Sequence, residues 1–249
     1  MNRRDEAHSK KTGRGAKRGR VEETEIERIE RELVERQNAL ANWTPRTELG
    51  RMVKSGKFTT LDDVFNSGKK IMEPEVVDSL TVIYDHLVQV ARTTRVTRAG
   101  RKYSYRADVL LGNKDGYIGI GSAKDVDRFP AINKAKRMAK LNLIKVYRGS
   151  GSWEEQATED KHSVPFKVEG KSGSVRVVLL PAPKGNGLAV GKAIRPVMEL
   201  AGIQNVWGQT KGRSTISLNF VQAAIDALRQ TGKMKASKDV ERKMSKTRS

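Results

Sequence analysis

No cysteine occurs among the 249 residues of this chain, which excludes disulfides, thiolate metal sites and cysteine nucleophiles. The three histidines, His8, His86 and His162, are scattered along the chain and offer no metal-ligand spacing. Neither a nucleophile–base pattern nor a pair of carboxylates stands out. We therefore expect no metal, no cofactor and no enzymatic activity. The lack of cysteine also fits a reducing, cytoplasmic location.

Long hydrophobic runs are absent as well. The sequence has no stretch of about 18 apolar residues, the length that a membrane-spanning helix needs. Its first 20 residues are charged and contain no apolar signal-peptide core. Aromatic residues make up only 5% and hydrophobic residues 37%, enough for small cores. We expect no membrane span and one or two small domains.

Acidic residues are few relative to basic ones. Lys and Arg number 49 against 29 Asp and Glu, a net charge of +20. Such a surplus favours a polyanion as partner, which from charge alone is RNA, DNA or an acidic membrane surface. Residues 1–20 carry eight basic and two acidic residues, and residues 233–249 carry seven and two. We interpret both ends as basic disordered tails that order only on a partner.

Between the tails, the pattern predicts a helical N-terminal extension, two α+β units and a linker. The extension spans 21–84 and includes a helix over 21–41, one capped by Thr59 or Thr60, and one opened by Pro74. The first unit spans 85–150, the polar linker 151–161 and the second unit 162–232.

The first unit is predicted to consist of three strands and one helix. Period-two alternation from Tyr103 to Leu111 indicates a strand, preceded by one over 87–97 and followed by one over 117–120. A helix is expected from Pro130 to about Ile144, with a buried face of Ile132, Ala135, Met138 and Ala139. In the second unit we expect strands over 162–169, 174–180 and 204–209. Helices there should end near Ala201 and span 217–231.

Two glycine-rich segments invite a nucleotide-binding interpretation. Gly116 and Gly121, with Gly119 between them, have the four-residue spacing of the P-loop glycines, but the Lys-Ser/Thr pair that must follow is missing. These glycines either tighten the strand edge or admit RNA backbone. Gly185, Gly187 and Gly191 have the wrong spacing for a dinucleotide site. A helix N-terminus there could still hold a phosphate beside Lys184 and Lys192; the alternative is that the glycines serve the turn and close packing.

Two basic clusters lie inside the folded part, each without an intervening acid in the sequence. The first is on the predicted hairpin and consists of Arg92, Arg95, Arg98, Arg101, Lys102 and Arg106. The second is on the predicted helix and includes Lys134, Arg137 and Lys140. Such clusters are often only solvated, but they also suit phosphate contacts. With Lys124, and with Tyr103 available for base stacking, they are the candidate RNA-binding residues.

The stretch from Gly100 to Lys124 resembles the signature of the universal small-subunit ribosomal protein five family. The resemblance continues through PVMELAGIQNVWGQTKG and NFVQAAIDAL, and covers most of residues 43–232. WTPRTELGRMVKSGKFTTLDDVF and HSVPFKVEGKSGSVRVVLLPAP are similar to the archaeal and eukaryotic branch, and the compact chain and its tails favour an archaeal member. Many archaeal relatives carry cysteines near the GSW segment, where this chain has Ser150 and Ser152.

The resemblance implies an α+β protein with a double-stranded-RNA-binding-domain-like unit of three strands and a helix. A two-layer α/β ribosomal domain with a left-handed crossover would follow it. It also implies a structural role in the small ribosomal subunit, bound to rRNA near the head–body junction and supporting translational accuracy. Small-subunit proteins four and eight and the mRNA entry path would lie nearby. The alternative is a free RNA-binding regulator or ribosome assembly chaperone.

Overall fold

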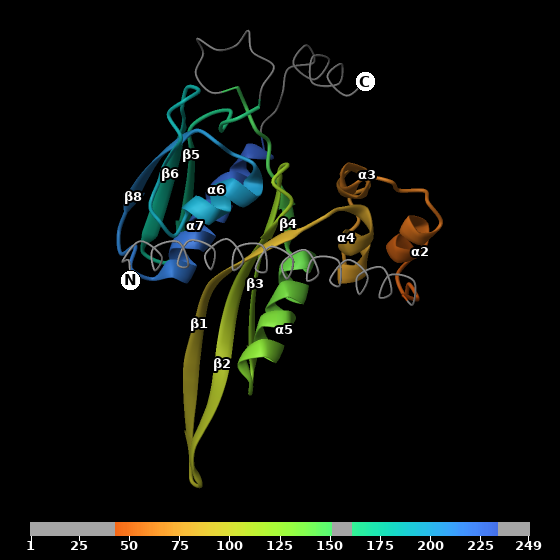
Figure 1. Ribbon diagram of the computed structural model, residues 1–249, viewed down its shortest axis with the longest axis vertical. Coiled ribbons are helices and arrows are strands. Elements are labelled where there is room, and N and C mark those ends of the chain that lie inside the picture. Colours follow the sequence, from red (N-terminus) through yellow and green to blue (C-terminus); the bar gives the residue numbers. More distant parts are fainter. Residues whose placement is uncertain (1–42, 151–160, 234–249) are drawn as a thin grey trace, which may run out of the picture.

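The computed structural model describes residues 43–150 and 161–233. The predicted basic arm, the helix over 21–41, nearly all of the linker and the C-terminal tail beyond Lys233 lie outside the described residues. In this part of the chain, two four-stranded sheets and six helices form a mixed α/β structure (Figure 1).

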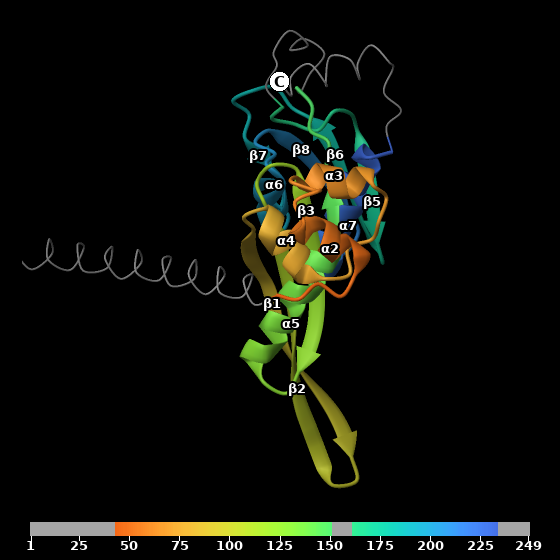
Figure 2. The same ribbon diagram turned by 90° about the vertical axis from the view of Figure 1, so that its right-hand side faces the viewer.

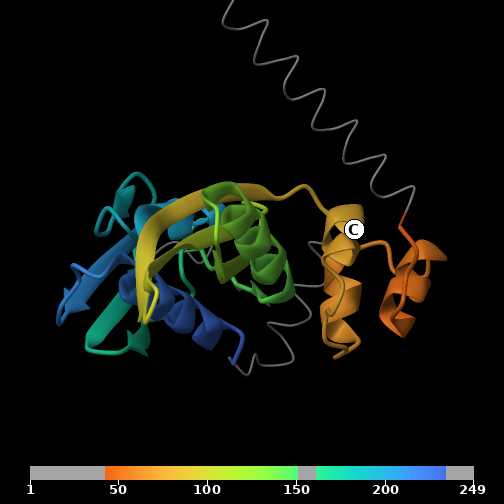
Figure 3. The same cartoon turned by 90° about the horizontal axis from the view of Figure 1, so that it is seen from below.

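Three short helices precede the first sheet: α2 (Glu48–Lys54), α3 (Leu61–Asn66) and α4 (Pro74–Leu80). Thr60 caps α3 in a capping box with Asp63, and Pro74 opens α4, as the sequence predicted. The three helices stand to one side of the sheet (Figure 3). Their small core includes Val64 and Val76 and extends to Tyr117 and Leu143 of the sheet.

The first sheet has the order β1-β2-β3-β4, with all neighbours antiparallel. Its strands are β1 (Tyr84–Thr97), β2 (Gly100–Gly112), β3 (Tyr117–Asp125) and β4 (Leu143–Lys145). The three predicted strands are confirmed, although β3 runs five residues beyond the predicted end at Ile120. The fourth strand was missed, because Leu143–Lys145 was interpreted as the end of a helix.

Helix α5 (Arg128–Leu141) covers one face of this sheet. The predicted helix from Pro130 to Ile144 is wrong at both ends, since Asp127 occupies the N-cap position and Asn142 the C-cap position. The buried face consists of Ala131, Ala135 and Ala139. Met138, predicted to be buried, is exposed, because the face in contact with the sheet is narrow.

The second sheet has the order β5-β6-β8-β7, in which only β7 and β8 are parallel. Its strands are β5 (Val168–Ser172), β6 (Val175–Pro181), β7 (Leu188–Ala189) and β8 (Val206–Lys211). The predicted strands over 174–180 and 204–209 match β6 and β8. The one over 162–169 is wrong, since β5 begins only at Val168 and Ser163 forms a single bridge with Gly149.

Helices α6 (Arg195–Ala201) and α7 (Ser217–Thr231) lie between the two sheets. The predicted bounds of α7 are confirmed. One continuous core joins Val177 and Leu179 of the second sheet to these helices and to Leu110 and Ile118 of the first sheet. The part of the first sheet that β2 and β3 form near the body is therefore covered on both faces, whereas β1 has no buried residue. The proposed division between the two units at the linker stays a prediction.

Candidate nucleic-acid interface

The β1–β2 hairpin is the most prominent surface feature. Its strands stay paired from Tyr84 opposite Gly112 to Thr97 opposite Gly100, and the distal half projects well beyond α5 and the body (Figures 1 and 2). Arg98 and Ala99 form the tip, and Gly100 follows with a φ of 107°, which glycine adopts without strain. The hairpin therefore carries its side chains away from the core.

Four cations near the tip, Arg95, Arg98, Arg101 and Lys102, are exposed. They have no carboxylate partner among the described residues. Arg95 lies directly opposite Lys102 in the strand register. Like charges in that position destabilise a strand pair by a few tenths of a kcal/mol up to about 1 kcal/mol. The tip thus holds uncompensated positive charge, which an external anion would neutralise.

Further toward the body, aromatic and polar contacts fix the hairpin. The Arg92 guanidinium carbon lies 3.6 Å from the centre of the Tyr103 ring, a cation–π stack that leaves Tyr103 44% exposed. Arg106 pairs with the buried Asp108 at 3.3 Å, and Gln89 and Ser122 donate hydrogen bonds to the same carboxylate. Asp108 therefore anchors the base of the hairpin, where Arg106 faces the exposed Lys124 across β2 and β3.

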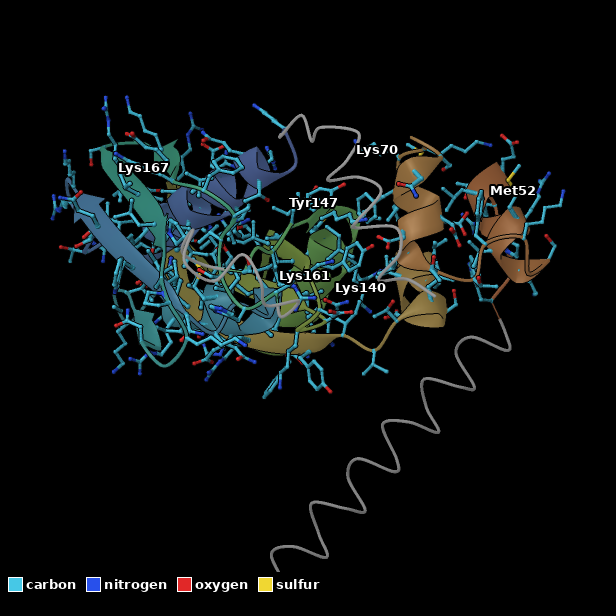
Figure 4. All side chains as sticks on the ribbon, turned by 90° about the horizontal axis from the view of Figure 1, so that it is seen from above. Met52, Lys70, Lys140, Tyr147, Lys161 and Lys167 are labelled. Atoms are coloured by element: carbon cyan, nitrogen blue, oxygen red, sulfur yellow. The ribbon has the colours of Figure 1, made fainter. Side chains whose placement is uncertain are left out.

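The helix cluster is different, because the fold brings acids from distant segments beside it. Lys134 Nζ lies 3.1 Å from Asp125 Oδ2, and Lys140 Nζ lies 2.7 Å from Asp78 Oδ2 on α4. Figure 4 shows Lys140 on the side of α5 that faces α4. The backbone N–H of Val126, followed by the Lys134 ammonium, lowers the pKa of the Asp125 carboxyl, which therefore stays charged beside Lys134.

Other cations on and around α5 are paired in the same way. Lys136 pairs with Asp85, Arg137 with Glu75 at 3.9 Å, Lys145 with Asp62 and Arg148 with Asp115. The cluster has no acid in its own stretch of sequence, but acids from other segments neutralise most of its positive charge. Its positive charge holds the N-terminal helices against the body. The hairpin tip, in contrast, carries positive charge that no carboxylate of the described residues compensates.

The three glycines of the P-loop-like segment face inward. Gly119 and Gly121 are buried in β3, and a Cβ built at Gly121 would lie 2.2 Å from the backbone oxygen of Ala135. Gly116 has a φ of 93° and faces the backbone oxygen of Val146. These glycines allow α5 and neighbouring backbone to approach the strand, and their contact with RNA backbone stays a prediction.

Lys184 and Lys192 are both exposed but do not share one hollow. Lys184 lines a shallow hollow with Lys161, His162 and Asn205, whereas Lys192 lines another with His86 and Pro196. Helix α6, expected to present a phosphate-binding N-terminus beside both lysines, begins only at Arg195 and has seven residues. The two lysines therefore line different hollows, and their role in binding phosphate stays a prediction.

Comparison with known proteins decides the family. A family model described as "Ribosomal protein S5, N-terminal domain" matches residues 83–147, and one described as "Ribosomal protein S5, C-terminal domain" matches residues 170–243. The chain belongs to the ribosomal protein S5 family. The members of this family are ribosomal proteins with a structural rather than an enzymatic role, and the predicted family is confirmed.

Archaeal S5 proteins are among the similar relatives. A "Small ribosomal subunit protein uS5" from Methanothermobacter thermautotrophicus is 47% identical over 199 residues, which cover 80% of this chain and 92% of the relative. The Pyrobaculum aerophilum protein of the same name is 49% identical over 193 residues, covering 77% and 88%. The Aeropyrum pernix protein is 50% identical over 193 residues, again covering 77% and 88%.

The described residues of this S5-family chain include no helix long and apolar enough to span a bilayer. Sequence reasoning missed one exposed basic group, Lys171, Arg176 and Lys211 on the second sheet. The sequence did contain a sign of this group, because Lys171 and Arg176 flank the Gly173-Ser174 turn at positions that pair in a hairpin. The acids that compensate α5 gave no local signal, since they lie up to 62 residues away in the sequence.

Proposed function

We propose that this S5-family chain is a structural protein of the small ribosomal subunit that binds rRNA through the β1–β2 hairpin. The observation that carries the proposal is the uncompensated positive charge at the hairpin tip. Arg98, Arg101 and Lys102 are exposed there and have no carboxylate partner in the described part of the chain. Phosphate groups are the anions that such a tip meets in a ribonucleoprotein particle.

The geometry suits recognition by shape and charge rather than by sequence. The tip can insert between RNA segments because the body lies well behind it (Figure 2). Tyr103, held in place under Arg92, offers a ring on which an unpaired base can stack. Phosphate contacts then fix position and orientation without reading bases. Lys124 and Arg106 extend the positive surface toward the body.

The family resemblance supports a more specific position for the protein in the small subunit. We place it near the head–body junction, in contact with small-subunit proteins four and eight and close to the mRNA entry path. A cationic hairpin at such a junction relieves phosphate repulsion and so holds the RNA in one of a few arrangements. An effect on translational accuracy follows, because decoding depends on how head and body are placed.

The test compares two triple variants of the full chain. The hairpin variant combines Arg98→Ala, Arg101→Ala and Lys102→Ala. The control variant combines Arg51→Ala, Lys57→Ala and Lys70→Ala, which remove the same charge from exposed positions in the segment before β1. Figure 4 shows that Lys70 lies on the N-terminal helical side. Both variants should fold as the wild type does, because none of the six side chains is buried.

The readout is the affinity for purified small-subunit rRNA as a function of salt. If about six to eight phosphates are neutralised, the wild-type log–log slope should be about −4 to −7, and the hairpin variant should lose about 2 to 3 of it. The control variant should stay close to wild type. Equal slopes for hairpin and control variants would mean that the hairpin is only solvated. A wild-type chain that leaves the small subunit in a high-salt wash would instead favour a free regulator or assembly chaperone.

A further inference from the structure

No described helix packs on one face of the second sheet. Helices α6 and α7 pack on the inner face, where Val175, Val177 and Leu179 of β6 are buried. The alternate residues Arg176, Val178 and Leu180 therefore belong to the opposite, outer face. Arg176 is exposed and Leu180 partly exposed there, whereas Val178, between Glu169 and Gln209 in the register, is buried. Figures 1 and 3 show β5, β6 and β8 at the margin of the molecule with the helices on one side only.

Three cations form a straight row across this outer face. Lys171 on β5 lies opposite Arg176 on β6, and Arg176 lies opposite Lys211 on β8. We call these three residues the cationic row. Because neighbouring strands are about 5 Å apart, the row spans about 10 Å. Like charges placed directly opposite one another disfavour the strand pairing, and here this occurs twice in succession.

Local carboxylates compensate the row only in part. Glu169 Oε1 lies 3.8 Å from Arg176 Nη1, and both side chains are about half exposed. Asp226 of α7 accepts a hydrogen bond from the backbone N–H of Lys171. Arg213, exposed just after β8, adds a further positive charge beside the end of the row. The outer face therefore keeps a net positive charge.

The β5 edge of the sheet is closed to a further strand. The outward backbone N–H groups of Glu169 and Lys171 on the edge strand β5 are bonded by Gln230 and Asp226 of α7. A peptide strand cannot add to an edge whose donors are already bonded. A partner that approaches on the β5 side therefore meets side chains, and the side chains of the row are cationic.

An exposed aromatic ring completes the surface. Trp207 on β8 is 43% exposed and lies opposite Leu180 on β6. It is four residues along β8 from Lys211, about 13 Å from the row at the usual rise per residue, and Gln209 lies between them on the same face. A row of cations and an exposed indole on one flat face is the combination that binds phosphates and stacks on an unpaired base.

We propose that the outer face of the second sheet is a second RNA-binding surface of this protein. The cationic row holds phosphates, and Trp207 stacks on a base. The identity of the polyanion as rRNA rests on the proposed ribosomal function, whereas the surface itself rests on the sheet register. The hairpin and the outer face lie on different sheets, so the two surfaces would contact separate RNA segments.

The test uses the full chain and small-subunit rRNA. In the row variant Lys171→Gln, Arg176→Gln and Lys211→Gln are combined, and in the control Arg51→Gln, Lys57→Gln and Lys70→Gln are combined, so that both have the same net charge. We expect the salt slope of the row variant to become shallower by about 2 to 3, and that of the control by less than about 1. The melting temperature of the row variant should equal or exceed that of wild type, because repulsion is relieved.

A photocrosslinking residue placed at Gln209 identifies what covers the face in reconstituted subunits. An adduct with rRNA supports the proposal, and an adduct with an acidic protein overturns it. Row and control variants with equal slopes also overturn it. If the hairpin variant still loses affinity, only the outer-face proposal fails, whereas a wild-type chain without salt-dependent rRNA affinity removes the proposed function as well.

Discussion

Replacing Lys102 by glutamate separates the stability of the hairpin from its function. Lys102 lies directly opposite Arg95, so Lys102→Glu turns a like-charge pair into an opposite-charge pair. Arg95 and Lys102 belong to the distal, projecting half of the hairpin (Figure 1), and both are exposed. The change should stabilise the hairpin locally while it removes a phosphate-binding charge.

The magnitude follows from the cross-strand geometry. Side chains directly opposite in an antiparallel pair interact by about 0.2–1 kcal/mol, with a sign set by their charges. Because both side chains are exposed, solvent screening keeps the total near the lower half of the possible range. We expect a gain of about 0.5–1 kcal/mol, which corresponds to an about two- to five-fold smaller equilibrium constant for opening of the strand pair.

Amide hydrogen exchange is the suitable assay, because the hairpin can open without global unfolding. Protection of the amides between Thr93 and Ser104 should rise in Lys102→Glu, and the global melting temperature should change little. Affinity for small-subunit rRNA should fall by more than in Lys57→Glu, which makes the same charge change at an exposed position on the N-terminal side.

Two results would refute this reasoning. Unchanged or lower protection in Lys102→Glu would show that Arg95 and Lys102 do not oppose each other across the strands. An rRNA affinity equal to that of Lys57→Glu would show that the hairpin charge acts only through the net charge of the protein. Higher amide protection together with weaker rRNA binding would show that the like-charge pair costs stability and contributes to binding the phosphates.

Three further predictions concern the body. Gly121→Ala should destabilise the fold by about 3 kcal/mol in urea denaturation, because the new Cβ would lie 2.2 Å from the backbone oxygen of Ala135. Asp78→Asn should cost about 1 kcal/mol, since it leaves the partly buried Lys140 without its carboxylate. Burial by itself would raise the pKa of the Glu73 carboxyl. The hydrogen bonds that its carboxylate accepts from the backbone N–H groups of Thr47 and Arg46 outweigh this effect, so the pKa is lowered. Stability from Glu73 is therefore present above its ordinary pKa and lost as pH falls through the lowered value, so wild type should lose more stability than Glu73→Gln on acidification from about pH 5 to 3.

Each of these predictions has a discriminating control. Wild-type stability of Gly121→Ala combined with weaker rRNA binding would restore the interpretation that RNA approaches this strand. Asp85→Asn, whose partner Lys136 is more exposed, should cost less than Asp78→Asn; the reverse order would contradict the role of burial. Parallel acid curves for wild type and Glu73→Gln would mean that the bonds from Arg46 and Thr47 do not favour the ionised carboxylate.

Local signals sufficed for part of the fold. Helix α7 has fifteen residues with strong apolar periodicity, and its bounds were predicted correctly. Thr60 and Pro74 mark helix starts by chemistry that depends only on neighbouring residues. Strand β4 has three residues directly after α5, so it carries no period of its own, and it forms only because β3 offers an edge.

The candidate site was predictable only where it depends on local sequence. The hairpin residues were identified from their alternation and the turn between them. The function of Gly119 and Gly121 depends on α5 lying against β3, and the compensation of Lys140 depends on Asp78 from the N-terminal helices. Both features depend on contacts between segments that are far apart in the sequence. A short window of sequence therefore gives no sign of either.

The most direct measurement is the position of the hairpin in a small ribosomal subunit that contains this chain, determined by electron cryomicroscopy. The side-chain nitrogens of Arg98, Arg101 and Lys102 should lie within about 3–4 Å of rRNA phosphate oxygens, as charge-assisted contacts require. A hairpin that lies in solvent, or that contacts only protein, would contradict the account.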